Sequence, residues 1–193
     1  MEIIIELATT FWQWVVVGIV VIAGWICTHF DGYGEERVGF KIDSMPKMMP
    51  LPIETADKGF WKGVWLWLMG VRQWQIAEDW HFEVNGNKHV VPAGFQFDGA
   101  SVPKFLATFL SPVGVLLMGG LVHDYAYKFA TLLNDDEEQT NIGPMTQKEA
   151  DILFRDICIE VNGFKVLNYL AYWSLRLAGF VAWNGHKNRG THI

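Results

Sequence analysis

A histidine and an aspartate stand side by side at positions 123 and 124, and they carry the clearest chemical signal in the chain. A neutral imidazole such as that of His123 can take a proton from water, and a carboxylate such as that of Asp124 can hold a hard cation. A second carboxylate, Asp151, follows on a later segment. The combination predicts a hydrolytic site in which a general base lies beside a metal ligand.

The segment after Gly120 is predicted to be the helix that carries this pair. Residues four apart share one face of a helix, so His123 and Tyr127 would point the same way. Asp124 would turn aside by about 100°. One helix can therefore direct a base inward and a carboxylate towards a neighbouring loop.

A second helix is predicted after Thr146, because Thr146 and Glu149 have the spacing of a capping box. Its apolar residues form an amphipathic stripe: Ala150, Leu153, Phe154, Ile157, Cys158 and Val161. Asp151 borders the stripe, so its carboxylate needs a polar partner at the edge of the core. We predict a hydrogen bond to His123 that fixes the tautomer of the ring. The alternative is a surface contact with Arg155, one turn further along.

The segment from Val91 to Pro103, VPAGFQFDGASVP, has the composition of a shaped loop. Within it, Asp98 and Ser101 offer oxygen atoms to a cation, and Asp98 is the candidate ligand. The alternative is a turn in which the Asp98 side chain only caps backbone amides.

The N-terminal part of the chain contains a long apolar run. From Leu7 to Phe30 there are 24 residues without Asp, Glu, Lys or Arg. As a helix, such a run reaches about 36 Å, enough to cross a hydrocarbon core of about 30 Å. We therefore predict a transmembrane anchor over residues 1–30 and a single-pass membrane protein. A cleaved signal peptide and a buried core helix are the alternatives.

The orientation of this anchor follows from the basic residues. None precedes the run, whereas Arg37, Lys41 and Lys47 follow it. The positive-inside rule then favours a cytoplasmic location for the rest of the chain. The opposite, periplasmic arrangement stays open.

The fold class predicted beyond the anchor is α+β. Residues 31–58 are rich in Gly and Pro and predict a linker, and residues 59–193 predict a small domain with a β-hairpin and several packed helices. The domain carries the His/Asp site. At its start, the aromatic segment from Phe60 to Val71 is expected either in the core or at a membrane surface.

The hairpin is predicted around Asn85-Gly86, a dipeptide typical of tight turns. Alternating apolar residues precede this turn, and a short β-prone segment follows it. His81 and His89 flank the turn and could face each other as a metal pair. Surface polar positions explain them equally well, and we favour that interpretation.

Two more apolar stretches lie further along. Phe105 to Val122 lacks charge over 18 residues but is broken by Pro and Gly, which predicts a short helix, a turn and a buried helix. A second membrane span is the alternative. Phe164 to Trp183 contains only Lys165 and Arg176 as charges. It predicts a helix that closes the core or lies on lipid, followed by a solvated polar tail.

Composition excludes several classes of function. With 193 residues, of which 51% are hydrophobic, the chain is too apolar to be disordered. A net charge of -6 without a basic block predicts no nucleic-acid partner. The two cysteines, Cys27 and Cys158, indicate neither a disulfide framework nor a zinc site.

Three blocks together resemble a known family: VPAGFQFDGASVP, GLVHDYAY and KEADILFRD. They are similar to an uncharacterised domain family of tailed phages and prophages with the signature VPxGFxTDGASxP, HDxxY and ADxxF. Phe97 stands where that signature has a small polar residue. The resemblance spans about residues 79–183 and implies a phage or prophage origin, with a location in a host inner membrane or a virion membrane.

A more remote similarity concerns phospholipase A2, in which an HDxxY motif is followed by an Asp on a second helix. That similarity implies His123 as the base that activates water, Asp151 as the acid that orients it and Tyr127 as a supporting hydroxyl. Asp124 would hold calcium, with the backbone around Asp98 completing the shell. The calcium loop and the disulfides of phospholipase A2 are missing from this sequence.

The function predicted from the sequence is hydrolysis of phospholipid esters by a calcium-assisted His/Asp site, with membrane lipid as partner. The alternative is a non-enzymatic membrane or virion component with membrane or virion protein partners. In that case the cluster of Asp98, His123, Asp124 and Asp151 would be a buried network that stabilises the fold. A metal-dependent peptidoglycan hydrolase would need more His or Asp ligands than this region offers.

Overall fold

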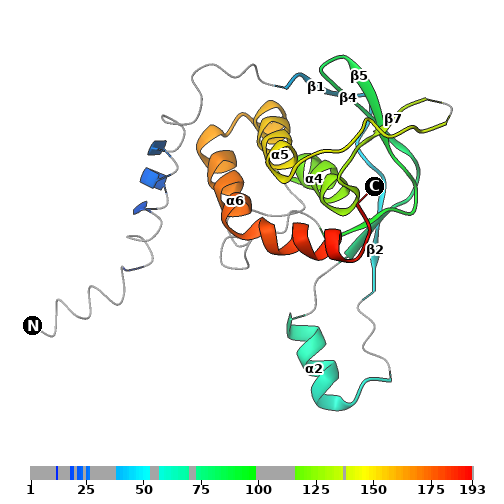
Figure 1. The fold of residues 1–193 in the computed structure, drawn as a ribbon. Helices are drawn as coiled ribbons and strands as arrows, with labels where there is room; N and C mark the ends of the chain where they lie inside the picture. Colours follow the sequence, from blue (N-terminus) through cyan, green and yellow to red (C-terminus); the bar gives the residue numbers. More distant parts are fainter. Residues whose placement is uncertain are drawn as a thin grey trace, which may run out of the picture.

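The computed structural model describes residues 38–52, 57–69, 73–98, 116–136 and 138–192, together with residues 12, 18, 19, 21–23, 25 and 26. For residues 67–69 only the backbone is described. Strands dominate the first half of these residues and helices the second half. The strands gather on one side of the molecule and three helices on the other (Figure 1), so the α+β class predicted for the domain is correct.

The first sheet contains four antiparallel strands in the order β1 (Phe40–Ile42), β4 (Trp80–Val84), β5 (Asn87–Val91) and β7 (Leu133–Asn134). Strands β4 and β5 form the predicted hairpin. Asn85 and Gly86 at its turn have φ angles of 52° and 83°, the left-handed values that a type I′ turn requires. Trp80 and Phe82 alternate along β4 and bury their rings in the core.

The second sheet contains three antiparallel strands in the order β2 (Met48–Leu51), β3 (Gln73–Ile76) and β6 (Gln96–Phe97). The helix α2 (Phe60–Met69) is inserted between β2 and β3. Strands β1 and β2 lie within residues 31–58, so this part of the predicted linker belongs to the sheets. Strand β1 pairs with β4, and β2 pairs with β3, through main-chain hydrogen bonds.

The two hairpin histidines do not face each other. His81 is opposite Val90, and His89 is opposite Phe82. The His89 ring is buried, at 4% exposure, and its Nδ1 lies 3.2 Å from the carbonyl oxygen of Leu133. The prediction of surface positions is right for His81, whose side chain is 51% exposed, and wrong for His89.

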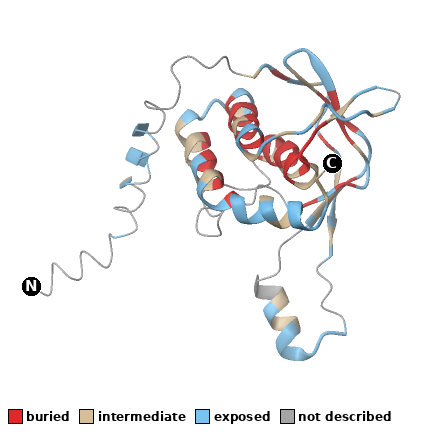
Figure 2. Ribbon diagram, in the orientation of Figure 1, coloured by how far each residue is buried: buried red, intermediate tan, exposed pale blue. Residues whose placement is uncertain are grey.

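Three helices form the other layer: α4 (Leu117–Phe129), α5 (Gln147–Asn162) and α6 (Lys165–Asn188). Helix α4 is the most deeply buried of them (Figure 2) and lies between the sheets and the other two helices. Gly119 permits its close crossing with α5, because a Cβ there would collide with Cys158 Sγ and with the Phe154 carbonyl oxygen.

Helix α5 begins with the predicted capping box. The Glu149 backbone N–H donates to the Thr146 hydroxyl, and the Thr146 N–H donates to the Glu149 carboxylate at 2.6 Å. The predicted apolar stripe is buried except for Val161. Asp151 is not at the edge of the core but wholly inside it, at 0% exposure.

The structure corrects the prediction of a transmembrane anchor. In the part of the chain that it describes, no helix is both long and apolar enough to cross a membrane. A span needs about 20 apolar residues, whereas α2 has 10 residues and α6, with 24, carries Arg176, His186 and Lys187. This finding contradicts the single-pass location and the cytoplasmic side derived from it. Most of residues 1–30 lie outside the described residues.

The two aromatic segments have different surroundings. Phe60, Trp61 and Trp65 of α2 are 75%, 81% and 63% exposed, so of the two surroundings expected for this segment the core is wrong. Helix α6 closes the core instead, with Ala171 and Leu175 buried. The stretch from Phe105 to Val122 falls partly on residues 105–115, outside the described residues, and its end forms the start of α4, which is buried as predicted.

Candidate active site

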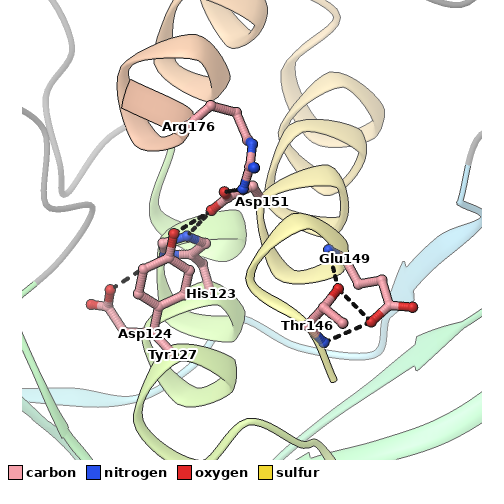
Figure 3. A network of polar contacts seen from close by, with 7 residues as sticks. All are labelled: His123, Asp124, Tyr127, Thr146, Glu149, Asp151 and Arg176. Atoms are coloured by element: carbon pink, nitrogen blue, oxygen red, sulfur yellow. Dashed lines mark hydrogen bonds and ion pairs between the residues drawn. The ribbon is translucent and has the colours of Figure 1, made fainter. Parts of the chain in front are cut away.

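Helix α4 presents His123 and Tyr127 to α5, one turn apart as their spacing predicts (Figure 3). The two rings lie 4.0 Å apart between their centroids, and both side chains are buried, at 3% and 5% exposure. The Asp124 side chain is 13% exposed. The same helix therefore places a buried ring beside a carboxylate at the margin of the core.

Asp151 of α5 receives three hydrogen bonds. His123 Nε2 lies 3.0 Å and the Tyr127 hydroxyl 2.5 Å from its Oδ1. Nη1 of Arg176 donates to its Oδ2 at 2.7 Å. A carboxylate with no exposed surface is stable as an ion only when its oxygens are bonded in this way. The hydrogen bond predicted between His123 and Asp151 is present.

These contacts determine the tautomer of His123. An ionised carboxylate only accepts hydrogen bonds, so the Nε2 atom that faces Asp151 carries a proton. In the neutral ring the lone pair is then on Nδ1. Nδ1 lies 3.8 Å from Asp124 Oδ1. The basic nitrogen is therefore on the side of the ring away from Asp151, towards Asp124.

The two carboxylates shift the acidity of the ring. Burial lowers the pKa of His123, but the contacts with Asp124 and Asp151 and their negative charges raise it more, so that the pKa lies above the ordinary 6.5. The imidazolium form is thus stabilised, as a base that accepts a proton requires.

Asp124 differs from Asp151 in having few partners. Burial raises its pKa from 3.8 to about 7, against the opposing effect of His123, and the neighbouring Asp98 raises it further. Among the described residues, no hydrogen-bond partner reaches its buried Oδ2 atom. Asp98 itself is exposed at the end of β6. The structure therefore brings the two predicted cation ligands near each other.

His123, Asp124 and Tyr127 line a pocket of about 390 Å³, which we call the His123 pocket. Its apolar walls include Phe95, Phe97 and Leu175. Gly179 of α6 also lines it, and a Cβ at that position would collide with the Tyr127 hydroxyl oxygen. The glycine thus allows α6 to approach α4 while leaving the space open.

Charged groups line the rest of the His123 pocket. Asp98 lies there together with Lys128 and His186. The Lys128 ammonium lies 5.3 Å from the centroid of the Phe95 ring. Burial lowers the pKa of His186, and the charges of Arg189, His192 and Lys128 lower it further. The lowered pKa favours the neutral ring of His186, so Lys128 supplies the cationic part of the pocket beside the acidic one.

Two features of the site were not predicted from the sequence. The arginine that donates to Asp151 is Arg176, whereas Arg155 bonds Asp156 at 2.7 Å. The signal for Arg176 was its place as one of only two charges in an apolar stretch, since a buried charge needs a partner. His186, predicted to be solvated, lines the pocket.

Metal binding has a limited set of donors. Among the described residues, no group of three or more His, Cys, Asp or Glu side chains is arranged to hold a metal ion. Asp98 and Asp124 form a pair of carboxylates. The sequence analysis also expects oxygen donors from the segment that follows Asp98. Its first residues, 99–101, lie outside the described residues.

Comparison with known proteins adds one assignment. Residues 74–175, just over half of the chain, match the family described as Protein of unknown function (DUF1353). The chain belongs to the DUF1353 family. No curated protein and no solved structure matches it.

The DUF1353 region contains most of the site but not all of it. Asp98, His123, Asp124, Tyr127 and Asp151 lie inside the matched residues. The α6 residues that complete the arrangement lie beyond it: Arg176 follows directly, and His186 lies further along the helix. Helix α2 precedes the matched region.

Proposed function

We propose that this DUF1353 protein hydrolyses phospholipid esters, with His123 as the general base. One observation carries the proposal. Nε2 of His123 is held by Asp151, while Nδ1 is directed to Asp124 at the end of a pocket. An oriented imidazole beside an open space is the arrangement that activation of water requires. The arrangement agrees with the similarity to phospholipase A2 in the HDxxY block.

In the proposed reaction, a water molecule in the His123 pocket gives a proton to Nδ1 while its oxygen bonds to the ester carbonyl carbon. Ionised Asp151 stabilises the resulting imidazolium through the Nε2–H bond, and Tyr127 with Arg176 holds Asp151 in place. The bond between the carbonyl carbon and the alcohol oxygen then breaks, and that oxygen takes the proton from Nδ1. The products are a fatty acid and a lysophospholipid.

Calcium is the proposed cofactor, held by Asp124 and Asp98. The donors fit in kind, because carboxylate oxygens suit a hard cation and the buried Oδ2 of Asp124 has no hydrogen-bond partner among the described residues. Calcium takes 6–8 oxygen ligands, so backbone carbonyls and water would supply the others. When bound, the ion would stabilise the negative charge that develops on the ester carbonyl oxygen.

The lining of the pocket supports an amphiphilic substrate. Phe95, Phe97 and Leu175 offer apolar contact to an acyl chain. Lys128 offers positive charge to a phosphate group, and the His186 ring offers a hydrogen-bond donor. In a phospholipid, the acyl chain lies on one side of the ester bond and the phosphate group on the other.

A phage or prophage origin, implied by the three sequence blocks, is also part of the proposal. It predicts that the coding sequence lies among genes for virion assembly or lysis. A chromosomal neighbourhood without any such genes, in several bacteria that carry this protein, would contradict that origin.

The proposed activity is tested by release of fatty acid from phospholipid vesicles, with calcium or with a chelator. We expect calcium-dependent release by the wild type and a loss of at least about 100-fold in His123→Asn, because general-base catalysis contributes about 10²–10⁴-fold. His81→Asn, a change at an exposed histidine, is the matched control. Equal release by the wild type and His123→Asn would overturn the proposal.

The second candidate function is a structural one, as a non-enzymatic virion component. It is favoured by the burial of His123 and Asp151, at 3% and 0% exposure. Against it stands the buried Asp124 Oδ2, for which the described residues supply no hydrogen-bond partner. If the wild type releases no fatty acid while His123→Asn is strongly destabilised, the structural candidate is supported.

A further inference from the structure

Helix α2 exposes a dense group of aromatic side chains. Phe60, Trp61 and Trp65 are 75%, 81% and 63% exposed, although these residue types are ordinarily packed against other apolar groups. Figure 2 shows α2 apart from the layers that form the core. An exposed apolar cluster of this size indicates a contact with another body.

The charges of α2 indicate what that body is. The helix FWKGVWLWLM contains Lys62 and no acidic residue, and Asp57 and Lys58, of opposite charge, lie just before it. A second copy of α2 has no acidic residue within the helix that could pair with Lys62. An anionic lipid surface would instead attract the lysines and accept the aromatic rings at the level of its headgroups.

The length of α2 agrees with contact at a surface. Ten residues reach about 15 Å as a helix, roughly half of the hydrocarbon thickness of a bilayer. The helix can therefore lie in the interfacial region, with its lysines among the headgroups.

The position of α2 connects it to the His123 pocket. The helix is inserted between β2 and β3. Leu51, the last residue of β2, pairs with Gln73, the first residue of β3. Gln73 also lines the His123 pocket. In Figure 1, α2 projects from the end of this sheet on the side where the last turns of α6 lie. A surface bound by α2 would thus lie close to the pocket.

We propose that α2 docks the protein on anionic phospholipid surfaces and thereby brings the His123 pocket to the lipid. The docking stands on the exposed aromatic residues and lysines alone. Its consequence for the pocket rests on the proposed phospholipid hydrolysis.

The test measures binding of the full-length chain to vesicles of phosphatidylcholine, with and without phosphatidylglycerol, by co-sedimentation. The double variant Trp61→Ser/Trp65→Ser removes the exposed rings. Phe164→Ser, at an aromatic residue that is 61% exposed at the start of α6, is the matched control. We expect the double variant to lose at least about tenfold in affinity and the control to behave like the wild type.

The lysines are tested separately. Lys58→Gln/Lys62→Gln should weaken binding to anionic vesicles by on the order of fivefold for each lysine. The corresponding arginine variants should retain binding, and added salt should reduce the difference. Undiminished binding by both the tryptophan and the lysine variants would overturn the proposal. A wild-type dimer in solution that dissociates in the tryptophan variant would overturn it in favour of a second copy as the partner.

A comparison of two substrates separates the docking from the chemistry. If both proposals hold, the ratio of vesicle hydrolysis to hydrolysis of a dispersed short-chain phospholipid falls in the tryptophan variant. Vesicle binding that depends on α2, without hydrolysis of either substrate, supports the docking and overturns the hydrolase. Hydrolysis with an unchanged ratio overturns the docking.

Discussion

The two sides of the His123 ring have opposite surroundings. On the Nε2 side, Asp151 is fully buried and bonded to three donors from three different residues. On the Nδ1 side, Asp124 is partly exposed to a pocket, and its pKa is raised to about 7. The bonded carboxylate of Asp151 stabilises the fold and orients the ring. The Oδ2 atom of Asp124, which has no hydrogen-bond partner among the described residues, is suited to bind a group that arrives from outside.

The largest effect should follow from a change on the satisfied side. Asp151→Asn removes the negative charge that His123 and Arg176 share, and a buried ion pair that loses one partner costs about 3–5 kcal/mol. We expect a loss of this size in the free energy of unfolding, measured by chemical denaturation. Glu160→Gln, at an exposed residue of the same helix, is the control. A loss below about 1 kcal/mol would show that the three hydrogen bonds do not stabilise the protein.

A smaller effect is expected at the third donor. Arg176→Met keeps the apolar stem but removes the bond to Asp151 Oδ2, and hydrogen bonds to charged groups contribute about 1.5–3 kcal/mol. Arg176→Lys should restore part of the stability. If Arg176 positions Asp151, the methionine variant should also lower kcat with little change in KM. Identical behaviour of the Met and Lys variants would contradict a role for the charge.

On the Asp124 side of the ring, we expect the free energy of unfolding to depend on pH. The raised pKa of Asp124, from 3.8 to about 7, means that the folded protein binds more protons than the unfolded chain in this range. The free energy of unfolding should therefore fall as the pH rises from about 4 towards 7. The raised pKa of His123 acts in the same direction. Its contribution to the free energy of unfolding is fully present below pH 6.5 and is lost as the pH rises through the pKa of the folded state. Asp124→Asn should reduce the slope, and its stability near pH 8 should match or exceed that of the wild type.

The same variant distinguishes stability from activity. Hydrolysis should increase as His123 and Asp124 lose their protons, opposite to the trend in stability, and Asp124→Asn should lose the response to calcium. Thermal unfolding and fatty acid release, both followed from pH 5 to pH 8, would show the two trends. A wild type whose stability rises over this interval would contradict the raised pKa values.

The smallest effect is expected at the cationic part of the pocket. Lys128→Gln should lower the preference for a phospholipid over a neutral ester by a few-fold, because a partly exposed ion pair contributes about 0.2–1 kcal/mol. Lys187→Gln, at an exposed lysine of α6, is the control. An unchanged preference would contradict the proposed contact between Lys128 and the phosphate group.

Local patterns in the sequence predicted the local structure well. The Asn85-Gly86 turn, the Thr146 and Glu149 capping box and the apolar stripe of α5 depend on neighbouring residues, and all three are present. The transmembrane prediction, which depended on a count of apolar residues, was wrong, since no helix in the described part of the chain is long and apolar enough to cross a membrane. The sequence could not decide whether α2 is exposed, since an apolar segment fits a core or a surface equally well.

The sequence alone determined which residues could meet: a helical spacing of four joined His123 to Tyr127, and the stripe beside Asp151 indicated that this carboxylate needed a partner. Only the tertiary structure decided that Arg176 completes the bonding of Asp151 and that Lys128 and His186 share the pocket with Asp124. The physical reason is distance along the chain. Contacts within a helix follow from its fixed geometry, whereas contacts between helices depend on how the packed layers are arranged.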